Sequence, residues 1–64
     1  MEFHALVTRV RAEFIEMPGL RLTMKQATRL WGMEDTVCQT VVDSLVRTSF
    51  LRRTEGGTFV RAEP

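Results

Sequence analysis

The chain has 64 residues, of which 44% are hydrophobic and 27% charged, with a formal net charge of +1. A chain this short buries about 60% of its unfolded surface and sustains one core, so we expect a single domain over residues 1–64. This composition excludes disordered and collagenous chains. No apolar run reaches the roughly 18 residues that cross a bilayer, so we expect no contact with a membrane. The start, Met-Glu-Phe-His-Ala, lacks the features of a signal peptide, which predicts a cytoplasmic protein.

The first stretch predicts an amphipathic helix over about 3–17. Its apolar residues recur at steps of three and four, which is the spacing of one helical face: Phe3, Leu6, Val7, Val10, Phe14 and Met17. Pro18-Gly19 ends this helix, since proline disfavours helical geometry in the residue before it. The alternating Leu20-Arg21-Leu22 that follows is long enough only for a short strand or an extended connector.

A second helix is expected over 24–31. Thr23 with Gln26 three positions later is the capping-box spacing, in which each side chain satisfies the other residue's free backbone N–H. Gly32 suits the left-handed C-terminal cap. The residues predicted to point inward are Met24, Ala27, Leu30 and Trp31.

A third helix is expected over about 35–48, with Glu34 or Asp35 as its N-terminal cap. Its predicted buried stripe consists of Cys38, Val41, Val42, Leu45 and Val46. Its predicted outward face consists of Thr36, Gln39, Thr40, Asp43 and Arg47.

The last segment predicts a two-stranded hairpin over about 50–61. Two strand-like runs, Phe50-Leu51-Arg52-Arg53 and Thr58-Phe59-Val60-Arg61, flank Thr54-Glu55-Gly56-Gly57. The glycines permit the positive φ angles of a tight turn. Ala62-Glu63-Pro64 is expected to be a frayed tail. The predicted fold class is mainly α with a small β-hairpin (α+β).

This element order resembles that of winged helix-turn-helix domains along almost the whole chain. The local match is Gln26-Ala27-Thr28-Arg29-Leu30-Trp31-Gly32-Met33, followed by Cys38 and Val41-Val42. The string Pro18-Gly19-Leu20-Arg21-Leu22-Thr23, with Leu30-Trp31-Gly32 and Phe50-Leu51, is also similar to short stand-alone bacterial proteins without an assigned role. The first resemblance implies a three-helix fold with the hairpin as a wing. It also implies a transcriptional regulator that binds double-stranded DNA.

In that family the third helix enters the major groove and the preceding helix crosses the phosphate backbone. The candidates for base contacts are Thr36, Gln39 and Thr40, and glutamine can bond adenine through both of its amide groups. The candidates for phosphate contacts are Arg21, Lys25, Arg29, Arg47, Arg52, Arg53 and Arg61. The same residues also fit an ordinary solvated surface. One small domain offers few contacts, so a homodimer that pairs through the first helix is a further expectation.

The near-neutral charge and the acidic Glu34, Asp35 and Asp43 leave an alternative open, a protein-interaction module that does not bind DNA. Trp31 and Cys38 fit the core, and His4 fits the surface. No catalytic constellation, metal-ligand spacing or phosphate-binding glycine loop is present in the sequence. We therefore expect a non-enzyme without a metal or cofactor.

Overall fold

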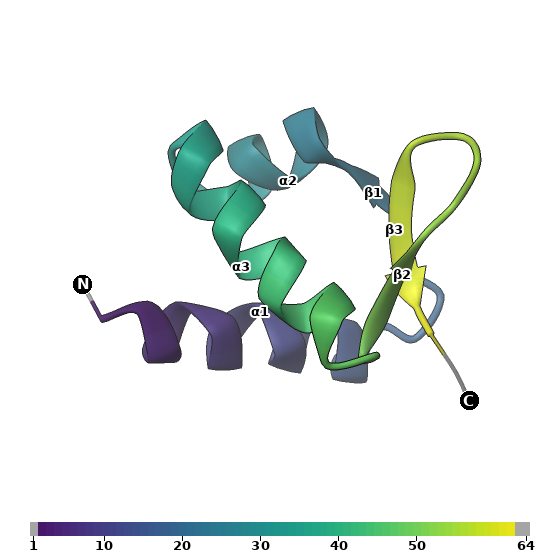
Figure 1. The fold of residues 1–64 in the computed structure, drawn as a ribbon, viewed down its shortest axis with the longest axis horizontal. Helices are drawn as coiled ribbons and strands as arrows, with labels where there is room; N and C mark the ends of the chain where they lie inside the picture. The colour runs from purple at the N-terminus through teal and green to yellow at the C-terminus, as the bar shows by residue number, and fades with distance from the viewer. Residues whose placement is uncertain (1, 63–64) are drawn as a thin grey trace.

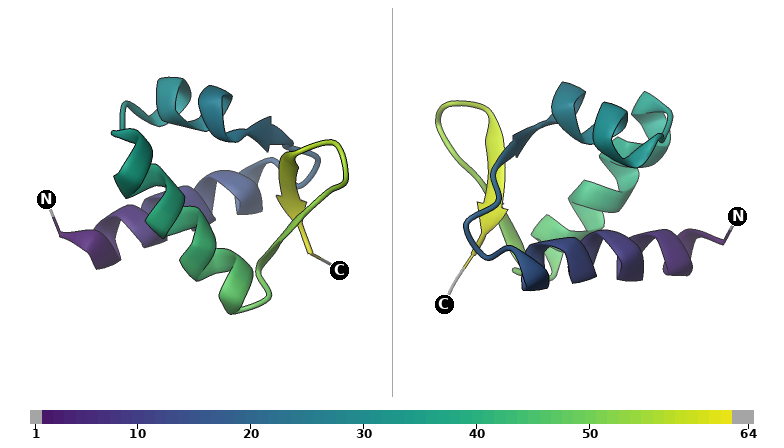
Figure 2. Two further views of the ribbon diagram at one scale, coloured as in Figure 1. Left: turned by 45° about the horizontal axis from the view of Figure 1, so that its top comes forward. Right: turned by 180° about the vertical axis from the view of Figure 1, so that it is seen from behind.

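Three helices and a three-stranded antiparallel sheet make up residues 2–62, the part of the chain that this computed structural model describes (Figure 1). The predicted α+β class is confirmed. In chain order the elements are α1 (Phe3–Glu16), β1 (Leu22–Thr23), α2 (Met24–Trp31), α3 (Asp35–Arg47), β2 (Leu51–Arg53) and β3 (Thr58–Arg61). Figure 2 shows the sheet at one end of the helices, beside the C-terminal end of α1.

Helix α1 presents Leu6, Val10 and Phe14 to the interior. The Met17 N–H donates to the Glu13 carbonyl at 3.0 Å and closes the last turn before Pro18-Gly19. Phe3 and Met17, the outermost residues of the predicted apolar face, are 43% and 47% exposed. Both lie at the ends of the apolar stripe, beyond the central part of α1 where the buried side chains cluster.

Helix α2 begins at the predicted capping box. The Gln26 N–H donates to Thr23 Oγ1 at 3.1 Å, and the Thr23 N–H donates to Gln26 Oε1 at 2.9 Å. Gly32 ends the helix in the left-handed conformation, with a φ of 65°. Leu30, however, was wrongly predicted to point inward, since its side chain is 54% exposed. It lies roughly 100° around the helix from Trp31. Trp31 and Ala27 are buried, and the half-buried Met24 packs against the same core.

Helix α3 buries Cys38, Val41, Val42 and Leu45, while Val46 is half-buried. Glu34 occupies the N-cap position, but its side chain makes no capping hydrogen bond. The predicted side-chain cap is therefore absent, and the charge of Asp35 in the first turn remains as the favourable interaction with the helix dipole.

The sheet has a third strand, β1, where the sequence predicted either a short strand or an extended connector. Leu22 and Thr23 pair with Phe59 and Thr58, so that the strand order is β1-β3-β2 and β3 is central. Gly57 takes a φ of 84° in the β2–β3 turn, as the glycine pattern predicted. Ala62 is not frayed, because its N–H donates to the Phe50 carbonyl at 3.0 Å. Residues 63 and 64 lie outside the described part of the chain.

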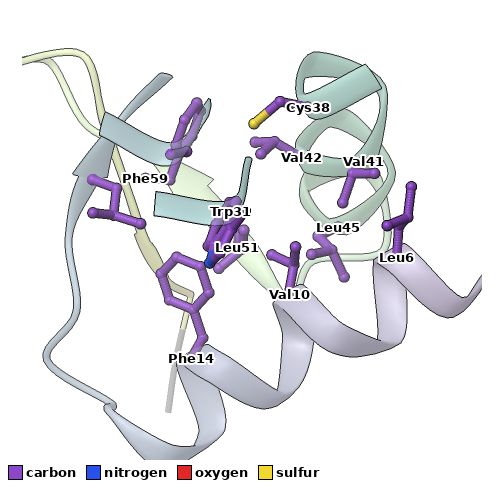
Figure 3. Close-up of a cluster of buried hydrophobic side chains, with 12 residues drawn as sticks. Leu6, Val10, Phe14, Trp31, Cys38, Val41, Val42, Leu45, Leu51 and Phe59 are labelled. Atoms are coloured by element: carbon purple, nitrogen blue, oxygen red, sulfur yellow. The ribbon is translucent and has the colours of Figure 1, made fainter. Parts of the chain in front are cut away.

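All six elements contribute to one buried cluster (Figure 3). Its fully buried members include Val10, Phe14, Val41 and Leu51. The Phe14 and Trp31 rings meet edge to face, with 6.2 Å between centroids and 64° between planes, a favourable aromatic arrangement. The predicted burial of Trp31 and Cys38 is confirmed.

Candidate nucleic-acid interface

An open groove runs between α2 and α3. Its volume is about 460 Å³, and it is lined by Met24, Lys25, Thr28, Arg29, Asp35 and Gln39. Lys25 and Arg29 share one side of α2 because they are four residues apart. The left-handed Gly32 turns the chain so that the first turns of α3 form the opposite wall. The structure thus brings two predicted phosphate contacts beside the predicted base contact Gln39.

The groove carries more positive than negative charge. Lys25 and Arg29 are exposed and form no ion pair with any described residue. Asp35 is the single carboxylate in the lining. Two cations against one anion leave this groove suited to an anionic ligand.

Thr36 and Thr40 lie on the exposed side of α3 but do not line the groove. The Thr40 hydroxyl donates to the Thr36 carbonyl at 2.8 Å, so its oxygen is left as an acceptor for a ligand. Arg47 is exposed in the last turn of α3. The predicted site residues of α3 are therefore spread along the helix rather than gathered at one point.

The three arginines of the hairpin do not share one face. Arg52 pairs with Val60 across the ladder, whereas Arg53 pairs with Phe59 and Arg61 pairs with Leu51. Directly paired residues project to the same face of a sheet. Since Leu51 and Phe59 are buried, Arg53 and Arg61 lie on the face that meets the core, and Arg52 lies on the outer face.

Arg53 is already engaged within the molecule. Its guanidinium forms an ion pair and hydrogen bond with Asp43 of α3 and lies 5.2 Å from the centroid of the Phe59 ring. The Arg53 and Asp43 side chains are 48% and 45% exposed. A phosphate would have to compete with Asp43 for this arginine.

Arg61 and Arg11 both stack on Phe50. Their guanidinium carbons lie 4.7 Å and 5.0 Å from the centroid of that ring. Sequence reasoning missed Arg11, which no pattern within α1 distinguishes from the other charged residues there. The contact arises only because the fold brings the junction between α3 and β2 beside α1.

Arg21 lies away from the α2–α3 groove. It lines a second hollow, of about 420 Å³, with Leu22, Gln26, Arg29 and Leu30. Arg29 is the one lining residue common to both hollows. The predicted phosphate contacts Arg21 and Lys25 therefore line different hollows, and Arg29 lines both.

Cys38 is buried on the side of α3 that faces the core. Burial, and secondarily the charge of Asp35, raise the pKa of its thiol. It therefore remains a neutral thiol near pH 7, a small apolar group rather than a reactive thiolate. Within residues 2–62, no three His, Cys, Asp or Glu side chains converge as metal ligands would, and no helix has the length and apolar character needed to cross a membrane.

Comparisons with protein-family models, with curated proteins and with solved structures found no match for this chain. Its function is therefore inferred from the groove and the charges around it.

Proposed function

We propose that this chain is a small winged helix-turn-helix protein that binds double-stranded DNA, as a cytoplasmic, bacterial-type transcriptional regulator and not as an enzyme. The observation that carries the proposal is the α2–α3 groove, where Lys25 and Arg29 lie beside Gln39 without an ion pair to any residue of 2–62. The element order, with the β2–β3 hairpin following α3, supports the same proposal.

In this proposal α3 enters the major groove, with Gln39, Thr36 and Thr40 toward base edges. Lys25 and Arg29 contact the phosphate backbone and fix the register of the protein on the duplex. Arg52, on the outer face of the hairpin, supplies a further phosphate contact. Arg53 supplies one only where phosphate displaces Asp43.

A single module presents few contacts to DNA. We propose that two copies bind together and pair through the side of α1 that exposes Phe3 and, just past its end, Met17. A second module doubles the contacts to DNA and so raises the affinity.

The test of DNA binding is an amide NMR titration with a mixed-sequence duplex at low salt. We expect the largest shifts in residues 24–29 and 35–40. In a separate binding assay, Lys25→Ala combined with Arg29→Ala should reduce the slope of log K against log salt concentration by about 2, because each phosphate contact contributes about 0.9.

Arg9→Ala combined with Arg11→Ala is the matched control. It also removes two exposed cations, but from α1, so the slope should stay near its original value. An unchanged slope in the groove variant would refute the phosphate role of Lys25 and Arg29.

A second candidate function is a protein-interaction module on the same scaffold. It is favoured by Asp35 in the groove and by Asp43, which compensates the charge of Arg53. Carboxylates at these places repel phosphate but suit a mixed-charge protein surface. This candidate predicts that duplex DNA shifts no amide in the same titration.

A further inference from the structure

We infer that the side of α2 turned away from α3 binds an acidic protein segment that carries an apolar side chain. This surface, called here the α2 flank, consists of Arg21, Leu22, Gln26, Arg29 and Leu30. It is a second binding surface, which shares only Arg29 with the groove proposed for DNA.

The α2 flank has its own geometry. Gln26 and Leu30 are four residues apart and so lie on one side of α2, while Lys25 and Thr28 line the α2–α3 groove. Leu30 is 54% exposed and lies in a shallow hollow with Arg21 and Leu22. A large apolar side chain here can be covered by a ligand without any rearrangement of the core.

The free polar groups of the α2 flank are hydrogen-bond donors, so they bind acceptors on a ligand. Arg21 and Arg29 form no ion pair among residues 2–62, and no acidic residue lines the hollow. The Gln26 Oε1 atom already accepts the Thr23 N–H, so the amide NH2 group is what remains for a ligand. Guanidinium and amide donors around an apolar centre are complementary to carboxylates that flank an apolar side chain.

Leu30 distinguishes an acidic protein segment from nucleic acid as the occupant. The phosphate backbone offers charge but no aliphatic side chain, so it would pair with the arginines and leave Leu30 in water. A protein segment can bury Leu30 and pair with both arginines at once, which is the combination of apolar anchor and polar rim seen in protein interfaces.

The experiment measures the fluorescence anisotropy of a labelled peptide in which one leucine is flanked by glutamates. We expect saturable binding to the full chain and about tenfold weaker binding to Leu30→Ser, because the variant loses the buried leucine contact. Ile15→Ser is the matched control, since Ile15 is 52% exposed on α1, and its affinity should equal that of the unmodified chain.

The arginines are tested by the salt dependence of the same binding. Arg21→Gln should weaken binding and flatten its salt dependence, whereas Arg9→Gln, on α1, should not. DNA affinity distinguishes the two surfaces: Leu30→Ser should leave it unchanged, whereas Lys25→Ala should lower it and leave peptide affinity unchanged. If the chain does not bind DNA, the peptide assay still tests the inference.

A second measurement does not depend on any variant. On addition of the peptide to the unmodified chain, we expect amide NMR shifts at residues 21–22, 26 and 29–30. Equal affinity of Leu30→Ser and Ile15→Ser, absence of saturable binding, or shifts at residues 21, 22 and 30 with duplex DNA and none with the peptide would each overturn the inference.

Discussion

At the scale of single residues, the contacts of a charged side chain within the protein determine whether it is free to bind a ligand. Arg52 and Arg53 are adjacent in sequence, yet only Arg53 pairs with Asp43 and packs over Phe59. Alternation along a strand predicts that two neighbours face opposite ways. Which of them faces the core depends on the pairing of β2 with β3 and on the position of α3, neither of which is written in the local sequence.

Asp43→Asn is expected to raise DNA affinity by about fivefold at low salt. The change frees Arg53 and removes a negative charge beside α3, and a unit charge at close range in water contributes about 1 kcal/mol. The stability of the fold should change by less than about 1 kcal/mol, because the ion pair is half exposed. Anisotropy with a labelled duplex, together with urea unfolding, measures both quantities.

Glu16→Gln removes the same charge at the end of α1 and provides the control for the effect of net charge alone. If both variants raise the affinity equally, the effect belongs to the total charge. The ion pair with Arg53 would then have no part in it.

At the scale of the elements, the turn between α2 and α3 places both walls of the groove. Gly32 has a φ of 65°, and a Cβ added there would meet no atom within 4 Å. Its role is therefore conformational and not steric, since side-chain-bearing residues rarely adopt this backbone geometry.

Gly32→Ala should lower the free energy of unfolding by about 1 kcal/mol, which is the cost of the left-handed conformation for a residue with a Cβ. Gly19→Ala is the matched control: it also has open space around it but no positive φ. It should be neutral or slightly stabilising. Urea denaturation midpoints at a constant m-value measure the difference, and equal midpoints for the two variants would contradict the role assigned to Gly32.

The helices could be predicted because their signals are local. The capping box of Thr23 and Gln26, the glycine at position 32 and the apolar spacing of α3 each act within a few residues. The pairing of Leu22 with Phe59 could not be predicted, since it joins distant parts of the chain. A two-residue strand has too little pattern to identify its partner.

The sequence predicted which side chains of one helix lie together, but not how all the candidate residues are placed in the fold. Lys25 and Arg29 share one side of α2, as their spacing predicted, and Gln39 of α3 lines the same groove. The exposed side chain of Leu30 does not follow the prediction. An eight-residue helix has too few turns for its apolar pattern to determine which side is buried.

At the scale of the whole molecule, one buried cluster joins α1, α2, α3 and the sheet. A domain this small has only a few kcal/mol of stability from its core. No element can therefore lose its main buried side chain without consequences for the others. The groove between α2 and α3 depends on α1 for this reason, although α1 does not line it.

Phe14→Ala should cost about 3–5 kcal/mol and leave most of the chain unfolded at room temperature. Ile15→Ala, at the next position of the same helix, should cost less than about 1 kcal/mol because Ile15 is largely exposed. Thermal melts followed by circular dichroism compare the two variants. A cooperative melt of Phe14→Ala near that of the unmodified chain would show that α1 is dispensable for the remainder of the fold.

The chain contains one tryptophan and no tyrosine, and Trp31 is enclosed against Phe14, with its indole N–H lacking a hydrogen-bond partner in the described part of the chain. Nearly all ultraviolet emission of the native protein therefore originates from one buried side chain. Unfolding should shift the emission maximum toward longer wavelengths, because water then reaches the indole. A ligand bound at the surface should leave the wavelength of the maximum unchanged. The molecule thus carries an optical probe that separates loss of structure from occupancy of its outer faces.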